Sequence, residues 1–355
     1  MAALQARAYR RALRRRGRAL LDYAAPEGLP RLRAALAAML AATRGLAAGP
    51  DDLIVTRGSQ MALYLIARAL VTPGDLVAVE SIGYVPARAA FRLAGARLVP
   101  LPLDEHGVDP AALDALARKG PVRAIYLTPH HQYPTTVTLS PGRRLQLLEI
   151  ARAHRIAVVE DDFDHEFHYD GRPVLPLASV DRAGVVVYVG TLSKILAPSL
   201  RMGYVVGPAP LLARLKDLRA TIDTMGDPAL EDAIAELVEE GEVQRHVRRV
   251  RRRYQARRDA LAECLRRDLP DLSFAVPAGG VAFWARAQDS ADVDEWARRA
   301  LARGVFFSPG GAFAFDERPL PFLRLGFACL TEEEIAEAVR RMAAARQPRR
   351  AARAK

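Results

Sequence analysis

Residues 185–206, VVVYVGTLSKILAPSLRMGYVV, decide the fold of this chain. An apolar run at 185–189 is followed by a polar turn that holds Ser193 and Lys194, and then by a second apolar run at 202–206. A run that is apolar at every position is typical of a strand with both faces covered. The stretch therefore predicts two buried strands of an α/β sheet with a polar turn between them.

The flanking segments repeat the pattern of short apolar runs and helical spacing. The other predicted strands of this part are 53–56, 76–79, 97–101, 122–127 and 157–160, and the helices between them are 59–70, 84–94, 110–118 and 143–154. Such alternation predicts an α/β fold, with a mixed, mostly parallel sheet covered by helices.

The two ends of the chain have a different pattern. Helices are predicted at 4–20 and 29–40, and a long helical stretch at 228–269 is broken near Gly241. The remaining predicted elements are strands at 272–276, 281–285, 305–308 and 322–326 and helices at 293–303 and 332–345. We therefore predict an N-terminal helical arm (1–45) that joins a small α+β domain (229–345), a large domain (46–228) and a basic tail (346–355).

Composition excludes several classes of protein. Half of the 355 residues are hydrophobic, which excludes a disordered chain, and two cysteines, Cys264 and Cys329, exclude a disulfide scaffold. No apolar run reaches the 18 residues that a membrane helix needs, and the N-terminus lacks an apolar signal region. We expect a cytoplasmic protein.

The net charge of +11 is concentrated in three patches. Residues 7–18 hold seven arginines, residues 245–258 hold eight, and residues 346–355 hold four arginines and a lysine, with no acid in any of them. Basic stripes fit nucleic acid, whereas a solvated helix face or a tail is the more common explanation. The sequence leaves both readings open.

Polar residues follow the predicted strands where ligands of open α/β sheets bind, at the carboxyl ends. Gly58, Ser59 and Gln60 follow strand 53–56 and open a helix, which suits a phosphate. Asp161 follows strand 157–160. Ser193 and Lys194 follow strand 185–189, and Arg201 precedes strand 202–206.

Lys194 is the most informative of these residues. Of the four lysines, it alone directly follows a predicted buried strand. Desolvation there would favour the neutral, nucleophilic amine that forms Schiff bases. Its neighbours Ser193 and Arg201 are good phosphate ligands, and Asp161 could pair with a pyridinium nitrogen. This set predicts pyridoxal 5′-phosphate as cofactor; the alternative is a solvated helix N-terminus.

The run 190–204, GTLSKILAPSLRMGY, resembles the lysine segment of fold type I, class I/II aminotransferases, and is most similar to the aminotransferase-like domain of MocR-type regulators of the GntR family. Further similar segments follow in the same order: GLPRLRAAL (28–36), TRGSQMAL (56–63), ESIGYVPAR (80–88), TPHHQYPT (128–135), VEDDFDHEFHYDG (159–171), HVRRVRRRYQARRDAL (246–261) and LRLGFA (323–328).

This resemblance implies a role for each candidate residue. Lys194 would form the Schiff base and shuttle the proton, and Asp161 would pair with the pyridine nitrogen. Tyr84 would stack on the cofactor ring, Gln132 would lie near its O3′ side, and Arg324 would bind the substrate carboxylate. The residues at the phosphate end would be Ser59, Gln60, Ser193 and Arg201.

Four positions depart from the family pattern. Phe163 stands where tyrosine is usual in the family, so the hydroxyl that would bind O3′ is missing; we expect altered or reduced turnover and intact cofactor binding. The others are Thr136 in the Pro134-Thr135-Thr136 turn, Ile82 and Cys329.

The predicted activity is amino transfer between an amino acid and a 2-oxo acid, in a homodimer with no membrane contact. The similarity to aminotransferases begins near Tyr9, without the winged helix-turn-helix of MocR regulators, so we do not expect nucleic-acid binding. The first alternative is a regulator's effector domain that senses pyridoxal phosphate or an amine. The second is a metal-dependent hydrolase, and its candidate ligands are His130, His131, Asp161, Asp162, Asp164, His165, Glu166 and His168. We predict no metal, because neighbouring residues of a strand point to opposite faces.

Overall fold

A computed structural model describes residues 2–287 and 292–346 and divides the chain into two compact units, each with its own core. Unit 1 comprises Met1–Gln132, Val137–Glu166 and Arg172–Arg249. Unit 2 comprises Tyr133–Thr136, Phe167–Gly171 and Val250–Lys355. The predicted basic tail lies outside the described residues from 347 onward.

Unit 1 is built on a seven-stranded sheet with the order β1-β9-β8-β7-β6-β2-β3. Its strands are β1 (Leu53–Thr56), β2 (Leu76–Glu80), β3 (Arg97–Leu101), β6 (Val122–Leu127), β7 (Ala157–Asp162), β8 (Val186–Thr191) and β9 (Gly203–Val206). Neighbours from β3 to β8 run parallel, whereas β9 is antiparallel to both β8 and β1. The predicted mixed, mostly parallel sheet is confirmed.

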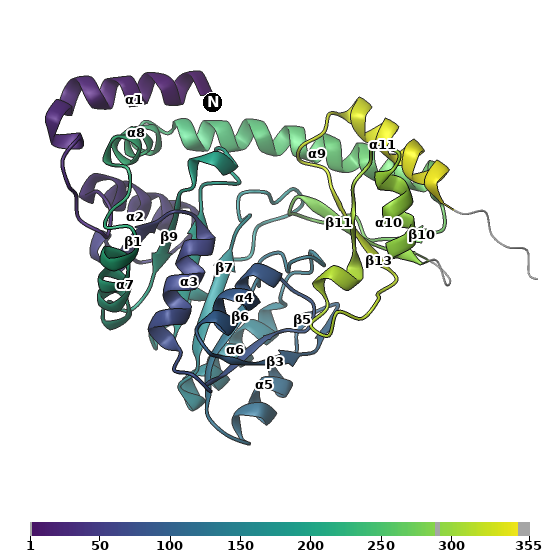
Figure 1. The fold of residues 1–355 in the computed structure, drawn as a ribbon, viewed down its shortest axis with the longest axis horizontal. Helices are drawn as coiled ribbons and strands as arrows, with labels where there is room; N and C mark the ends of the chain where they lie inside the picture. The colour runs from purple at the N-terminus through teal and green to yellow at the C-terminus, as the bar shows by residue number, and fades with distance from the viewer. Residues whose placement is uncertain (1, 288–291, 347–355) are drawn as a thin grey trace, which may run out of the picture. The chain divides into compact units, whose positions relative to one another are not determined.

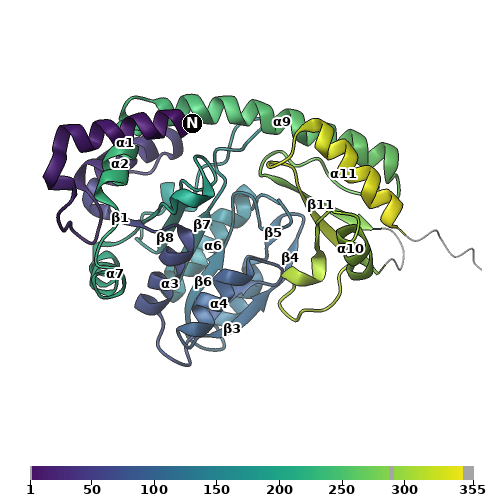
Figure 2. The same ribbon diagram turned by 45° about the horizontal axis from the view of Figure 1, so that its top comes forward.

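Helices cover this sheet as the alternating pattern predicts. The helices of the sheet region are α3 (Ser59–Leu70), α4 (Val85–Leu93), α5 (Pro110–Ala117), α6 (Pro141–His154) and α7 (Ala209–Ile222). Helices α5 and α6 share a buried cluster with Ala78, Ile125 and Val158 of the strands, while α3 packs against α4 and α7. Figure 2 shows α3 and α4 lying over the strands. Sequence reasoning missed α7, although it buries Leu211 and Leu215 at helical spacing.

The remaining elements of unit 1 are the N-terminal arm, helix α8 and short segments. They are α1 (Ala2–Arg16), η1 (Gly17–Leu20), α2 (Pro30–Arg44), η2 (Pro50–Asp52), β4 (Leu103–Asp104), β5 (Gly107–Val108), η3 (Leu177–Ser179), η4 (Pro198–Leu200) and α8 (Pro228–Glu239).

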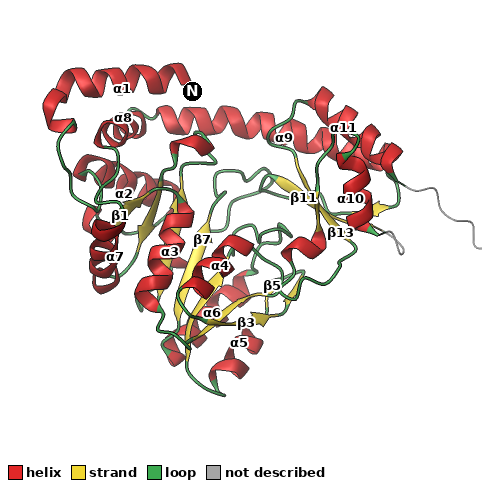
Figure 3. Ribbon diagram, viewed as in Figure 1, coloured by secondary structure: helices red, strands yellow, loops and turns green. Residues whose placement is uncertain are grey.

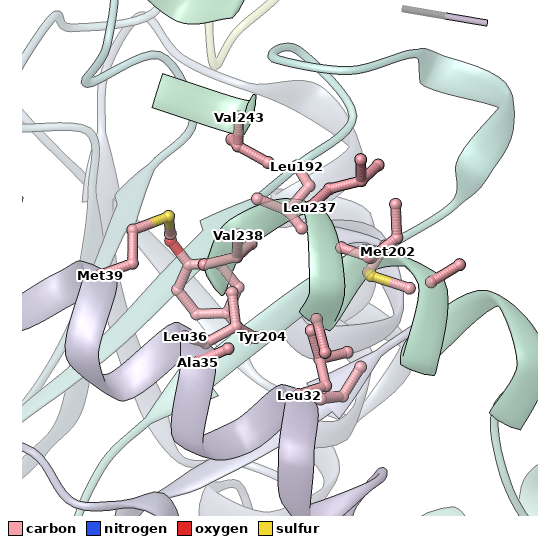
Figure 4. Close-up of a cluster of buried hydrophobic side chains, with 14 of the residues drawn as sticks. Leu32, Ala35, Leu36, Met39, Leu192, Met202, Tyr204, Leu237, Val238 and Val243 are labelled. Atoms are coloured by element: carbon pink, nitrogen blue, oxygen red, sulfur yellow. The ribbon is translucent and has the colours of Figure 1, made fainter. Parts of the chain in front are cut away.

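The N-terminal arm belongs to unit 1, whereas the sequence suggested that it joins the small domain. Helix α1 packs along α8, and the two lie side by side in Figure 1. Leu36 of α2 packs against Tyr204 of β9 and Leu237 of α8 in one apolar cluster, drawn in Figure 4. The predicted boundary at 229 differs for the same reason, because burial of α8 against α2 holds it in unit 1.

Charge pairing reinforces this packing. Asp232 of α8 is fully buried and lies 2.8 Å from Arg15, 3.1 Å from Arg16 and 3.1 Å from Arg31. Arg15 also pairs with Glu236. Part of the basic patch at 7–18 therefore faces an acidic helix of its own chain.

Unit 2 is the predicted smaller α+β domain. Its antiparallel sheet has the order β10-β11-β13-β12, and its elements are the C-terminal part of α9 (Glu242–Asp268), β10 (Leu272–Ser273), β11 (Ala282–Ala287), α10 (Val293–Leu301), β12 (Ser308–Pro309), η5 (Gly310–Phe313), β13 (Phe322–Gly326) and α11 (Glu332–Ala345). Figure 3 shows its strands in yellow. Among the described residues, no helix is both long and apolar enough to cross a bilayer.

Candidate active site

The strand register of unit 1 brings three candidate segments to one edge of the sheet. Gly203 of β9 lies opposite Thr56 of β1 and opposite Thr191 of β8. The residues just beyond these strand ends therefore lie together. They are Ser59 after β1, Ser193 after β8 and Arg201 before β9.

These segments form a cradle that suits a phosphate group. Ser59 is the first residue of α3, where free N–H groups and the helix dipole favour an anion. The Arg201 guanidinium donates a hydrogen bond of 3.2 Å to the Arg57 carbonyl. Gly58 has φ +80°, a conformation that side chains rarely adopt, and a Cβ there would lie 2.7 Å from that guanidinium, which would have to move.

Two further candidates lie close to this cradle. The Ser193 side chain is buried, and its hydroxyl has no hydrogen-bond partner among the described residues. Gln60 instead donates a 3.0 Å hydrogen bond to the carbonyl of Pro86, which ties α3 to α4. The phosphate-end role of Gln60 stays a prediction.

One carboxylate oxygen of Asp161 accepts a hydrogen bond, and within the described part of the chain the other, called its open oxygen below, does not. The Tyr126 hydroxyl donates to its Oδ2 at 2.9 Å, and its Oδ1 is buried without a partner among the described residues. Burial raises the pKa of Asp161 to about 7, although the Tyr126 hydrogen bond and the charge of Lys194 act to lower it. A buried carboxylate oxygen without a donor can accept from a protonated ring nitrogen.

Asp162, the next residue, belongs to a separate buried network. It accepts from the Tyr188 hydroxyl at 2.7 Å and lies 3.0 Å from Nδ1 of His165 and 3.7 Å from Nε of Arg44. Burial acts to raise the pKa of Asp162, but His165, His130 and Arg44 hold it below its ordinary value. The alternation of β7 thus gives two adjacent aspartates different surroundings.

Lys194 lies three residues beyond the end of β8, and its side chain is exposed. The expectation that burial desolvates this lysine is therefore wrong. The reason is local: β8 is buried along its whole length, but the turn after Thr191 carries Lys194 out of the sheet. Its charge still acts on the Asp161 carboxyl, which places the two groups in the same region of unit 1.

Tyr84 and Gln132 lie on the segments that follow β2 and β6. Tyr84 is half-buried at the start of α4 and interacts electrostatically with Tyr126. Gln132 is buried and donates to Oε2 of Glu80 at 3.1 Å and to the Ile82 carbonyl at 2.8 Å. Glu80 was missed by sequence reasoning, although an acid ending the apolar strand LVAVE was a signal.

Arg324 lies in unit 2, on strand β13, opposite Trp284 and Ser308. Its neighbours Leu323 and Leu325 point into the core of the unit, so the arginine faces the other side of the sheet. Its guanidinium carbon lies 4.9 Å from the centre of the Tyr133 ring. A half-buried guanidinium of this kind is suited to a carboxylate.

Several of the residues proposed above as metal ligands contact one another or other protein groups. His131 pairs with Asp164 at 2.9 Å. The ligand atoms of His130, Asp162 and His165 lie within 4.8 Å of one another. However, the rings of His130 and His165 stack with centres 4.4 Å apart and planes inclined at 27°, so their lone pairs lie in nearly parallel, separate planes, which is unfavourable for binding one ion.

Unit 1 thus offers the hydrogen-bonding groups and the amine that pyridoxal phosphate requires. The phosphate cradle, the open oxygen of Asp161, the Ser193 hydroxyl and the Lys194 amine all lie at the carboxyl edge of one sheet. These groups fit the cofactor that the sequence predicts, pyridoxal phosphate.

Comparisons with known proteins give the same picture. The family model "Aminotransferase class I and II" matches residues 2–342. Aromatic-amino-acid aminotransferase 1 of Thermococcus litoralis is 33% identical over 329 residues, which cover 91% of this chain and 79% of the relative. The crystal structure of LysN, an α-aminoadipate aminotransferase from Thermus thermophilus complexed with N-(5′-phosphopyridoxyl)-L-leucine, has a TM-score of 0.90 at 31% identity and covers 97% of this chain and 88% of that one.

A regulator is also among the relatives. The probable rhizopine catabolism regulatory protein MocR of Rhizobium meliloti is 36% identical over 313 residues, which cover 88% of this chain. The chain spans only 63% of that regulator's length.

Proposed function

We propose that this chain, which belongs to the class I and II aminotransferase family, transfers an amino group between an amino acid and a 2-oxo acid. Its cofactor is pyridoxal 5′-phosphate. The observation that carries the proposal is the open oxygen of Asp161, buried at the sheet edge that also holds Lys194 and the phosphate cradle. A buried acceptor without a donor is costly unless a ligand satisfies it.

The residues of this chain divide the work. When bound, pyridoxal phosphate holds the substrate amine and withdraws electrons from its α-carbon. Lys194 would take the proton from that carbon and deliver it to the cofactor's C4′ atom. Asp161 keeps the ring nitrogen protonated by accepting its hydrogen bond. Ser59, Ser193 and Arg201 bind the phosphate.

Other roles rest on the family resemblance. Arg324 binds the substrate carboxylate through its forked guanidinium, Tyr84 stacks on the ring, and Gln132 lies near the O3′ side. Homodimer formation and a cytoplasmic location are further parts of this proposal. Phe163 lacks the hydroxyl that the family usually offers, so we expect slow turnover with intact cofactor binding.

The test is covalent capture of the cofactor. The protein is loaded with pyridoxal phosphate, reduced with borohydride and mapped by mass spectrometry, and the label should be on Lys194. Lys194→Ala should lose both the label and the visible absorbance. The matched control is Lys216→Ala, because Lys216 is a half-exposed lysine that pairs with Glu27 at 3.1 Å on the surface. A wild-type protein that takes up no cofactor, or a label that persists in Lys194→Ala, contradicts the proposal.

The similarity to MocR supports a second candidate, an effector domain that senses pyridoxal phosphate or an amine. The two candidates differ in turnover. An aminotransferase converts its bound cofactor to the pyridoxamine form when amino acids are added, and a 2-oxo acid reverses the change. A sensor binds the cofactor and the amine but does not complete this cycle.

A further inference from the structure

Two buried tyrosines, on opposite faces of the unit 1 sheet, each donate a hydrogen bond to an aspartate of the neighbouring strand β7. Tyr126 of β6 lies opposite Val159 of β7, and its hydroxyl reaches Asp161, two residues further along. Tyr188 of β8 lies opposite Glu160, and its hydroxyl reaches Asp162, again two residues further along. Residues two apart on a strand share a face, so each tyrosine serves one of the two adjacent aspartates.

Tyr126 is held rigidly for this contact. Its side chain is 2% exposed. The centre of its ring lies 6.1 Å from the centre of the Phe91 ring in α4, and the two ring planes are inclined at 53°. Burial and the neighbouring Asp161 and Glu80 hold the pKa of Tyr126 well above its ordinary value, so the hydroxyl keeps its proton and can only donate to the carboxylate. A rigid strand position of this kind fixes the direction of a neighbouring side chain better than a loop does.

The surroundings of Asp161 make this donor important. Burial, Asp162 and Asp164 all disfavour its ionised form, while Tyr126 and Lys194 favour it. Lys194 lies on an exposed turn, whereas Tyr126 is buried and donates a hydrogen bond directly to Asp161. Tyr126 is therefore the better placed of the two groups to stabilise the ionised form.

We propose that Tyr126 is a positioning residue for the cofactor: its hydroxyl fixes Oδ2 of Asp161 and leaves Oδ1 as the acceptor for the protonated pyridine nitrogen. This inference rests on the proposed function. Without the hydroxyl, the carboxylate can rotate, and its second oxygen also becomes a buried acceptor without a donor.

The experiment compares Tyr126→Phe with Tyr188→Phe, which loses a hydroxyl of the same geometry from the aspartate next in sequence. Dissociation constants are measured by titrating each apoprotein with pyridoxal phosphate and with its 1-deaza analogue, in which a carbon replaces the pyridine nitrogen. The ratio of the two constants isolates the contact of the ring nitrogen from the remainder of the binding site. Thermal unfolding of each variant checks that both fold.

We expect Tyr126→Phe to weaken binding of pyridoxal phosphate about tenfold, the equivalent of ~1.4 kcal/mol and of one net hydrogen bond. Binding of the deaza analogue should change less than about twofold, and Tyr188→Phe should keep the wild-type ratio. In an Asp161→Asn background, Tyr126→Phe should have no further effect on the ratio. An additional effect of Tyr126→Phe in this background would show that the hydroxyl does not act through Asp161.

The possible failures can be told apart. A wild-type protein that binds neither compound defeats the proposed function. Two other results would overturn the role of Tyr126 and leave the proposed function intact. One is a Tyr126→Phe variant that keeps the wild-type ratio of the two dissociation constants. The other is a Tyr188→Phe variant whose ratio falls as much as that of Tyr126→Phe.

Discussion

Replacing Arg44 by methionine tests the buried charge network behind the candidate site. Arg44, at the end of α2, is 1% exposed, and its guanidinium pairs with Glu166 and lies 3.7 Å from Asp162. Methionine fills much of the volume but leaves the buried carboxylate of Asp162 and the partly buried carboxylate of Glu166 without this guanidinium. Removing one partner of a buried ion pair costs about 3–5 kcal/mol. Asp162 keeps the Tyr188 hydroxyl and His165, so we expect a loss of ~3 kcal/mol, near the lower end.

The assay is denaturant unfolding of the apoprotein at pH 8 and pH 5.5. Arg44 helps to hold the pKa of Asp162 below its ordinary value, but His165 and His130 lower that pKa more, so the Asp162 carboxyl should stay ionised at both pH values in Arg44→Met. The loss of stability should therefore be of similar size at the two pH values. The control is Arg118→Met, whose partner Asp114 forms an i,i+4 pair on the surface, and it should leave stability nearly unchanged at both pH values.

Two results would refute this reasoning. One is an Arg44→Met variant no less stable than Arg118→Met at pH 8. The other is a loss that disappears at pH 5.5, which would show that the Asp162 carboxyl takes up a proton there although His165 is still beside it. Adding Glu166→Gln to Arg44→Met should recover part of the stability, because it removes one of the two orphaned charges.

Three further predictions concern the phosphate cradle, Glu80 and the N-terminal arm. Gly58→Ala should weaken binding of pyridoxal phosphate at least about tenfold in a titration, because its Cβ would lie 2.7 Å from the Arg201 guanidinium, whereas Gly120→Ala, with open space around it, should not. Burial raises the pKa of Glu80 from 4.5 to about 7, so its stabilising effect is fully present below about pH 4.5 and is lost as the pH rises toward 7. Unfolding curves from pH 4.5 to 8 should show a decline that is smaller by ~1–3 kcal/mol in Glu80→Gln than in wild type, because Asp161, whose pKa is also raised to about 7, contributes to the decline in both proteins; parallel curves would count against it. Asp232→Asn should speed trypsin cleavage within α1 at low salt without changing cofactor absorbance, because Asp232 pairs with Arg15 and Arg16 of that helix, and unchanged cleavage would contradict the pairing.

Local pattern was sufficient for much of the sheet. Apolar runs predicted the seven strands of the large sheet, because most of these strands are buried on both faces and are apolar at nearly every position, although the edge strand β3 is largely exposed or partly buried. The turn with Ser193 and Lys194 was found because strand ends in such sheets carry ligands. Helix α7 was overlooked, although its helical spacing of leucines is as local a signal as the others.

The sequence by itself determined the fold class, the order of the strands along the chain and the chemistry of the turn after β8. Only the tertiary structure decided that the N-terminal arm packs on α8, that Lys194 is exposed, and that Tyr126 serves Asp161 while Tyr188 serves Asp162. The physical reason is distance along the chain. Periodicity reports which face of an element is buried, but a hydrogen bond between residues 35 apart, as for Tyr126 and Asp161, depends on which strands become neighbours and in which register.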